Sequence, residues 1–231
     1  MDSLVAAAIH DAKNSLNALG VWLVQARREF AGHANGAPSP ALEHAMQLTA
    51  RLTGQLVELL ALYRAGDGTL RMAVEDHNLV DFLEDVMAEL AYASSAEDPV
   101  KIDTDFAAAA RIGDWAFDAY LVKFVLLDAL RNALRHAQQR IRFSLAADSA
   151  GGIRFSIEDD GAGFPADVLR DEKAQDASQG AAMSASSSGL GLSFARLIAS
   201  RHAALADKHG RLELANDGLD KDGARFSLVL P

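Results

Sequence analysis

Apolar residues recur from Val5 to Phe30 at alternating intervals of four and three positions. This heptad spacing predicts an amphipathic helix with one continuous apolar seam. The members of the seam are Val5, Ile9, Ala12, Leu16, Leu19, Leu23, Ala26 and Phe30. The segment 32–39 (GHANGAPS) interrupts the pattern, so we expect the helix to end before it.

A second helix is predicted from Pro40 to about Ala65. Ser39 suits the N-cap and Pro40 the first helical position. The apolar spacing continues at Ala45, Leu52, Leu56, Leu59 and Tyr63, with Leu48 and Leu60 beside them. Two such helices form an antiparallel hairpin, and its seam can be buried only against a second hairpin. We therefore expect a four-helix bundle in a homodimer.

After a hinge at 66–68 (GDG), the chain mixes helical and strand-like patterns. Strands are expected near 70–74, 100–106, 141–147, 153–159, 211–215 and 225–230. Helices are expected over 78–92, 115–136 and 190–202. The predicted fold class is therefore α+β, with the helical hairpin over residues 1–66 and an α/β sandwich with a mixed, largely antiparallel sheet over residues 67–231.

Composition narrows the classes of function. The 231 residues are 50% apolar, which suffices for two cores. No run approaches the ~20 apolar residues of a membrane-spanning helix, and neither a secretory signal nor a cysteine is present. We expect a cytoplasmic chain with no direct membrane insertion. A net charge of -10 without a basic cluster argues against nucleic acid as a partner.

One histidine stands beside the first seam. His10 follows the seam residue Ile9, so its ring is expected to point away from the hairpin core, with Asp11 and Asn14 on the same side. A neutral imidazole is nucleophilic, and a neighbouring carboxylate can hold one ring nitrogen protonated. Taken alone, the same motif also fits a solvated surface pair.

The helix expected over 115–136 carries a core stripe and a polar strip. The core stripe consists of Tyr120, Phe124, Leu127, Leu130 and Leu134, and the polar strip of Asp128, Asn132, Arg135 and His136. An amide oxygen at Asn132 can coordinate a hard cation, and Arg135 and His136 can meet phosphate charge. An ordinary solvated helix face has the same pattern.

The segment 157–165 (IEDDGAGFP) places an acidic residue and two glycines at the end of a strand. Asp159 offers a hydrogen-bond acceptor, while Gly161 and Gly163 allow a tight turn where a flat ligand must approach the backbone. A simple strand-end turn uses the same residue types. The motif alone leaves both interpretations open.

A second glycine motif, SSSGLGLS (186–193), precedes a predicted helix. Gly189 and Gly191 would leave backbone N–H groups free at the helix start, where the helix dipole favours phosphate. Glycine-rich helix starts also occur without any ligand.

Taken in order, these motifs resemble the transmitter core of two-component sensor histidine kinases. That core joins a dimerisation and histidine-phosphotransfer hairpin to a catalytic domain of the gyrase and heat-shock-chaperone ATPase type. HDAKN (10–14) resembles the histidine box and DALRNALRHA (128–137) the asparagine box, while DDGAGF (159–164) and SGLGLS (188–193) resemble the two glycine boxes. The resemblance covers nearly the whole chain.

The resemblance implies a role for each residue of the motifs. His10 would accept the γ-phosphoryl group of ATP with help from Asp11, and Asn14 would orient water in a reverse, dephosphorylating reaction. Asn132 would hold Mg²⁺, and Asp159 would accept a hydrogen bond from the adenine amino group. The remaining residues of the nucleotide site would be Asp128, Arg135, His136, Gly161, Gly163, Ser188, Gly189, Leu190, Gly191 and Leu192.

Three features depart from the family pattern. Asp128 stands where the asparagine box begins with asparagine, and it adds negative charge near the triphosphate while still able to bind Mg²⁺ through water. Ser187 replaces the first glycine of the second glycine box. The lid between the glycine boxes, 165–188, lacks the family's phenylalanine-containing segment.

The leading interpretation is an ATP-dependent protein-histidine kinase whose partner is the receiver domain of a response regulator. Two alternatives stay open: a non-enzymatic phosphotransfer relay with a degenerate ATPase-like domain, and a protein that acts mainly as a response-regulator phosphatase. Nine residues precede His10. Two explanations stay open: the chain is a piece of a longer sensor, or the signal arrives through a separate sensor or input protein.

Overall fold

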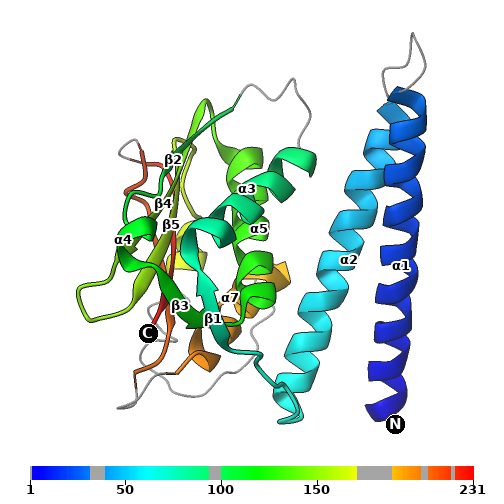
Figure 1. The fold of residues 1–231 in the computed structure, drawn as a ribbon, viewed down its shortest axis with the longest axis horizontal. Helices are drawn as coiled ribbons and strands as arrows, with labels where there is room; N and C mark the ends of the chain where they lie inside the picture. Colours follow the sequence, from blue (N-terminus) through cyan, green and yellow to red (C-terminus); the bar gives the residue numbers. More distant parts are fainter. Residues whose placement is uncertain (1, 32–39, 94–99, 171–188, 204–207, 220–221) are drawn as a thin grey trace. The chain divides into compact units, whose positions relative to one another are not determined.

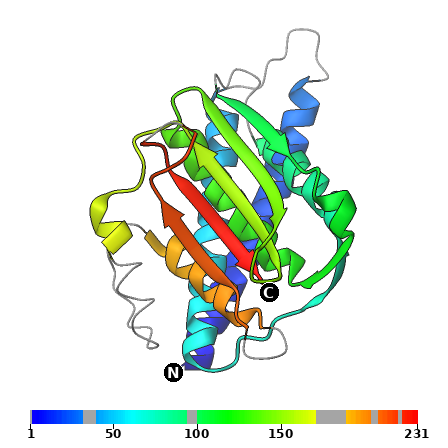
Figure 2. The same ribbon diagram turned by 90° about the vertical axis from the view of Figure 1, so that its left-hand side faces the viewer.

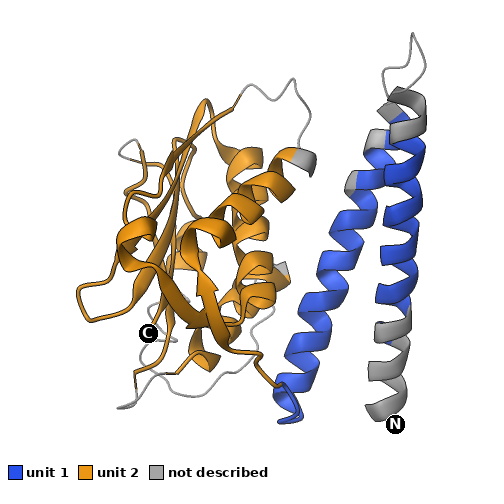
Figure 3. Cartoon of the chain, in the orientation of Figure 1, with its two compact units in different colours: residues 1–70 blue, residues 71–231 orange. Residues whose placement is uncertain are grey.

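The computed structural model describes residues 2–31, 40–93, 100–170, 189–203, 208–219 and 222–231. The chain divides into two compact units, unit 1 (Met1–Leu70) and unit 2 (Arg71–Pro231), which Figure 3 shows in different colours. The division lies a few residues beyond the boundary expected at residue 66. None of the described helices combines the length and the apolar run that a membrane crossing requires.

Unit 1 consists of two long helices, α1 (Asp2–Ala31) and α2 (Pro40–Gly66), which run antiparallel and side by side (Figure 1). They pack closely at Gly20, where an added Cβ atom would lie 3.9 Å from Cγ2 of Thr49. The predicted seam of α1 is divided: Ile9 and Leu16 are half-buried, whereas Leu19 is 46% exposed. A large apolar surface of unit 1 therefore faces solvent in the single chain.

Unit 2 begins with an irregular stretch and then alternates strands and helices. In chain order its elements are β1 (Glu75–Asn78), α3 (Leu79–Ala93), β2 (Lys101–Asp105), α4 (Ala109–Ile112), β3 (Asp114–Phe117), α5 (Ala119–His136), β4 (Arg140–Ala147), β5 (Ile153–Asp159), α7 (Gly189–Arg201), β6 (Arg211–Ala215) and β7 (Arg225–Leu230). Residues 166–170 add a short helical segment between β5 and α7.

A five-stranded sheet organises unit 2, with the strand order β2-β4-β5-β7-β6. The β2–β4 pair is parallel and the other three pairs are antiparallel, so the predicted mixed sheet is confirmed. Helices α3, α5 and α7 cover one face, and Figure 2 shows the sheet from the opposite face. A separate two-stranded sheet pairs β1 with β3.

Two sequence expectations for unit 2 are wrong. No strand forms over 70–74, because the pairing with β3 begins only at Glu75. The helix expected from residue 115 starts at Ala119 instead, and the preceding residues form β3. Asp118 explains the boundary, since its backbone is extended and its carboxylate accepts a hydrogen bond from the Leu121 N–H at 3.0 Å, as an N-cap does.

The core of unit 2 lies between the sheet and its helices. Phe117, Phe143, Phe155 and Phe194 are its largest fully buried side chains. Helix α5 contributes Leu127 and Leu130 as expected, but Tyr120, predicted to lie in the same stripe, is 58% exposed. Tyr120 falls in the first turn of α5, where its neighbours Leu121 and Val122 take the buried positions instead.

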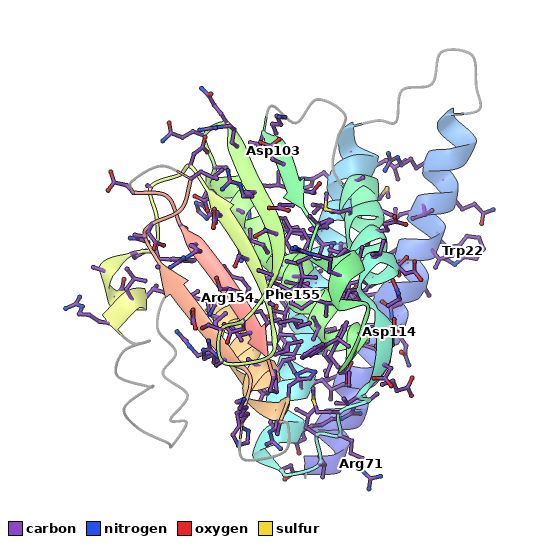
Figure 4. The ribbon with its side chains drawn as sticks, turned by 60° about the vertical axis from the view of Figure 1, so that its left-hand side comes forward. Trp22, Arg71, Asp103, Asp114, Arg154 and Phe155 are labelled. Atoms are coloured by element: carbon purple, nitrogen blue, oxygen red, sulfur yellow. The ribbon has the colours of Figure 1, made fainter. Side chains whose placement is uncertain are left out.

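The opposite face of the sheet is polar and held by ion pairs. Arg154 and Phe155 follow one another on β5 (Figure 4), and alternation places Phe155 in the core and Arg154 on the polar face. Arg154 pairs with Asp148 at 2.7 Å and with Glu213 of β6. Although burial alone would raise the pKa of Asp148, the hydrogen bonds from Arg154 and the Ala150 backbone outweigh it and lower that pKa.

Candidate functional site

Asp159 ends β5 and is the most firmly held residue of the predicted site. Its Oδ1 atom accepts hydrogen bonds from the Gly161 N–H at 2.8 Å and from the Ala224 N–H at 3.2 Å. Its backbone oxygen accepts from the Leu219 N–H at 3.1 Å. Oδ2 accepts no hydrogen bond from any described residue, although the side chain is buried. The carboxylate is therefore fixed through Oδ1, and Oδ2 is an acceptor that no described residue uses.

The glycines after Asp159 allow close approaches that a side chain would block. A Cβ atom at Gly161 would collide with the carbonyl oxygen of His136, so the end of α5 rests directly on this loop. Gly163 has a φ of +75°, and its Cβ atom would lie 2.7 Å from Cγ of Asn216. Both glycines are thus required by the packing, and the DxGxG motif joins α5 to the end of β5.

Asp160 is a positioning residue that the sequence reasoning missed. Its buried carboxylate accepts hydrogen bonds from three successive backbone N–H groups, those of Gln138, Gln139 and Arg140, at 2.8 to 3.1 Å. Burial alone would raise the pKa of Asp160, but these N–H donors outweigh it and lower the pKa. The charge fixes the segment that follows α5. The second aspartate of the DDG sequence was the available signal.

The polar strip of α5 is assembled as its helical spacing predicts. Asn132 Nδ2 donates to Asp128 Oδ2 at 3.2 Å, and the Arg135 guanidinium donates to Asn132 Oδ1. Burial raises the pKa of Asp128, opposed by the charges of Arg135 and Arg131 and by the Asn132 hydrogen bond. His136 is exposed at the last turn. One helix face thus carries the side-chain oxygens of Asp128 and Asn132, each with one hydrogen bond from within the strip, next to the guanidinium groups of Arg131 and Arg135.

The second glycine motif forms the first turn of α7, which begins at Gly189. Leu190 is exposed, and Gly191 and Leu192 are half-buried. One turn further along, Phe194 packs edge-on against Phe124 of α5 with ring centroids 5.6 Å apart. This contact joins the helix of the GLGL motif to the helix of the polar strip. Ser187, Ser188 and the lid segment 171–188 lie outside the described residues.

The residues predicted to handle the phosphoryl group lie in unit 1. His10 and Asp11 belong to α1, but their side chains lie outside the described part of the chain. Asn14 is exposed, one helical turn after His10. The expected clustering of the three side chains therefore stays a prediction.

Comparison with known proteins identifies the C-terminal part of unit 2, residues 117–231. A family model described as histidine kinase-, DNA gyrase B-, and HSP90-like ATPase matches residues 117–231. These residues form an ATPase domain of that family. The match contains α5, α7 and the segment 159–164, called the Asp159 loop, so every motif assigned to nucleotide binding falls inside the ATPase domain.

A curated relative that aligns with nearly the whole chain is a histidine kinase. The signal transduction histidine-protein kinase AfsQ2 of Streptomyces coelicolor is 29% identical over 239 residues, which is 98% of this chain and 41% of AfsQ2. The chain thus spans about two fifths of the length of this curated relative. The expected resemblance to histidine kinases is confirmed.

Solved structures of histidine kinases share the fold. The histidine kinase AdeS of Acinetobacter baumannii matches with a TM-score of 0.59 and 17% identity, covering 91% of this chain and 94% of AdeS. Full-length ShkA in complex with AMPPNP matches with a TM-score of 0.64 and 19% identity, covering 100% of this chain and 46% of ShkA. At these identities the likeness shows the fold alone.

The donor set of the ATPase domain fits a purine nucleotide with its metal. Oδ2 of Asp159 can accept from an exocyclic amino group, whereas the space beside Gly161 and Gly163 is filled by the His136 backbone and the Asn216 side chain rather than open to a ring. Asp128 and Asn132 supply oxygen ligands of the type that Mg²⁺ prefers, and Arg135 lies beside them. No group of three or more histidine, aspartate or glutamate side chains suited to a metal occurs in the described part of the chain.

Proposed function

We propose that the chain is an ATP-dependent protein-histidine kinase that phosphorylates His10 and passes the phosphoryl group to an aspartate of a response regulator. The observation that carries the proposal is the Asp159 carboxylate, whose Oδ1 is held by two backbone donors and whose Oδ2 accepts no hydrogen bond from any described residue. It lies in an ATPase domain whose family includes the histidine kinases. An adenine amino group would complete the hydrogen bonding of Asp159.

In the proposed reaction the lone pair of one imidazole nitrogen of His10 attacks the γ-phosphorus of ATP. The bond between this phosphorus and the bridging oxygen breaks, ADP leaves with the electron pair, and the proton on the other ring nitrogen passes to Asp11 or water. Asn132 and Asp128 would hold Mg²⁺, whose charge offsets that of the phosphates. Mg²⁺ needs only one or two protein oxygens when phosphates and water supply its other ligands.

Unit 1 would act as the dimerisation and phosphotransfer hairpin. Leu19 and Trp22 on α1 are 46% and 66% exposed, and Leu48, Leu52 and Leu59 on α2 are exposed as well. The α2 leucines are spaced by four and seven positions, so they form one stripe on that helix. A second copy of the hairpin would bury these residues in a four-helix bundle. The homodimer is therefore part of the proposal.

Labelled nucleotide tests the proposal directly. The protein is incubated with γ-labelled ATP and Mg²⁺, and the label is tested for the acid lability and base stability typical of phosphohistidine. We expect label on the wild type, no label on His10→Gln, and normal labelling of the control His44→Gln, which changes an exposed histidine of α2. An unlabelled wild type, or a fully labelled His10→Gln variant, contradicts the proposal.

A second variant separates the nucleotide site from the fold. Asn132→Asp keeps the side-chain shape but replaces the amide with a second negative charge beside Asp128. We expect phosphorylation to be lost while the dimer persists in sedimentation velocity. If labelling is unchanged, Asn132 does not act at the metal site.

A further inference from the structure

Asn216, which follows β6, makes two hydrogen bonds to the backbone of one residue of the Asp159 loop. The Phe164 N–H donates to Asn216 Oδ1 at 2.7 Å, and Asn216 Nδ2 donates to the Phe164 carbonyl oxygen at 3.0 Å. The side-chain amide therefore serves both polar backbone groups of Phe164, as a neighbouring strand would. The two partners also fix which end of the amide carries oxygen and which carries nitrogen.

The Asp159 loop also packs against residues 216 and 222 through Gly163. Gly163, with its positive φ, contacts the Asn216 amide so closely that a Cβ atom would lie 2.7 Å from Cγ and 2.8 Å from Nδ2. The same Cβ atom would lie 2.5 Å from the backbone oxygen of Asp222. Asn216 is thus in contact with the second glycine of the motif as well as with Phe164.

The connection between β6 and β7 holds both ends of the Asp159 loop. At the start of the loop, Ala224 and Leu219 donate backbone N–H groups to Asp159, and Gly218 and Gly223 approach its carbonyl oxygen too closely to carry a side chain. At the end of the loop, the hold comes from the Asn216 side chain. Among the described residues of this connection, Asn216 alone holds the loop through a side chain, so a substitution can remove its contribution cleanly.

We propose that Asn216 is a positioning residue of the nucleotide site: it fixes the end of the loop at Phe164, which keeps the Asp159 carboxylate aimed at the ligand. Asn216 itself does not contact the nucleotide. The inference rests on the proposed function, because it assumes that Asp159 receives the adenine amino group. If the inference is right, removing the Asn216 side chain lowers the preference for ATP over ITP, whereas a variant that only destabilises the fold leaves this preference unchanged.

The test compares ATP with ITP, whose base carries an oxo group in place of the amino group. Dissociation constants for both are measured by calorimetry on the full chain with Mg²⁺. We expect Asn216→Ala to weaken ATP binding about tenfold, the effect of two modest hydrogen bonds. ITP binding should weaken less, so that the preference for ATP over ITP falls about threefold.

Asn78→Ala is the matched control. Asn78 is another exposed asparagine of unit 2, and its side chain donates to Asp114 Oδ1 at 3.0 Å and accepts from the Val80 N–H at 3.1 Å. We expect this variant to lower the melting temperature while leaving both dissociation constants and their ratio unchanged. A ratio that falls equally in Asn78→Ala would mean a general structural effect and would overturn the inference.

The isosteric variant Asn216→Asp guards against simple misfolding. It keeps an acceptor for the Phe164 N–H but sets a carboxylate oxygen against the Phe164 carbonyl oxygen. We expect weaker ATP binding than in the wild type, because a carboxylate cannot donate to the Phe164 carbonyl oxygen. ATP binding equal to the wild type in both Asn216 variants overturns the inference, whereas a wild type that binds no ATP overturns the proposed function itself.

Discussion

The two units of the chain treat their apolar residues in opposite ways. Unit 2 encloses a set of phenylalanines between the sheet and three helices, and Phe143 and Phe155 are fully buried. Unit 1 leaves Trp22 66% exposed, with leucines of both helices also in solvent. Burial of apolar area is the main favourable term in folding. Unit 2 therefore has a complete core of its own, whereas unit 1 has half of one.

The difference suggests a division of labour. A closed core fixes the relative positions of α5, α7 and the end of β5, which a nucleotide site needs. An open apolar face is suited to association, because its burial is still available as binding energy. The chain also offers a convenient way to follow each unit, since its two tryptophans, Trp22 and Trp115, lie one in each unit.

The largest effect is expected from opening the closed core. Phe155→Ala removes a buried ring that packs near Phe82 and Phe117, with centroids 6.0 Å and 6.3 Å away. The cavity should lower the free energy of unfolding of unit 2 by about 3–5 kcal/mol. Urea unfolding followed through Trp115, in a Trp22→Phe background, measures it. Val74→Ala, at an exposed position, should cost less than about 0.5 kcal/mol, and equal effects would contradict a closed core.

The next effect concerns the open face. The double variant Leu19→Glu and Leu52→Glu would place two charges on the surface that we assign to the dimer interface. Each change removes about 2 kcal/mol of leucine burial, so the double variant should weaken association at least a hundredfold in sedimentation equilibrium. Asn17→Glu, at an exposed polar position of α1, is the control and should leave the dimer intact. A wild type that stays monomeric at tens of micromolar would show that the apolar face has another use.

The smallest effect is expected from a buried histidine in the core of unit 2, which makes the stability of this unit depend on pH. The buried His202 accepts a hydrogen bond at Nε2 from the Asp118 N–H at 3.0 Å, and its Nδ1 lies 2.8 Å from the Ile198 carbonyl oxygen. Only a neutral ring with its proton on Nδ1 satisfies both contacts. Burial lowers the pKa of His202, opposed by the Ile198 carbonyl and the charge of Asp118.

The lowered pKa of His202 makes the stability of unit 2 depend on pH. Because the folded pKa lies below the ordinary value of 6.5, the unfolded chain binds the proton more readily, and unit 2 should lose stability as pH falls below about 6.5. The slope is at most about 1.4 kcal/mol per pH unit. Unfolding at pH 7.5, 6.5 and 5.5 should show a flatter dependence in His202→Gln than in the wild type. The exposed His209→Gln should keep the wild-type slope, and an unchanged slope in both variants would exclude His202 as the group involved.

Much of the fold was predictable because the patterns were long or clearly alternating. The bounds of β6 and β7 match the expected 211–215 and 225–230, where apolar and polar residues alternate between turn residues. The start of α5 was misplaced because Trp115 and Phe117 extend the apolar pattern of the helix backwards. Only the pairing of β3 with β1, which is remote in sequence, makes this stretch a strand.

The candidate site was predictable where a residue and its neighbours in sequence form a recognisable motif. Asp159 and its glycines stood out because this sequence suits a tight turn beside a ligand. Asp160 and Asn216 were missed because their partners are backbone groups about 20 and 50 residues away in sequence, at Gln138–Arg140 and Phe164. A hydrogen bond to a distant backbone leaves no local pattern, so only the folded chain reveals it.

Because residues of the β6–β7 connection contact Asp159 and Phe164, these contacts can form only late during synthesis of the chain. The loop at 159–164 leaves the ribosome well before residues 216–224, which supply the contacts at both of its ends. Domains fold as units while the chain emerges, and here the base of the nucleotide site cannot close until nearly all of unit 2 has been made. A nascent chain that stalls before Asn216 would carry all four sequence motifs but lack every contact that the β6–β7 connection makes to Asp159 and Phe164.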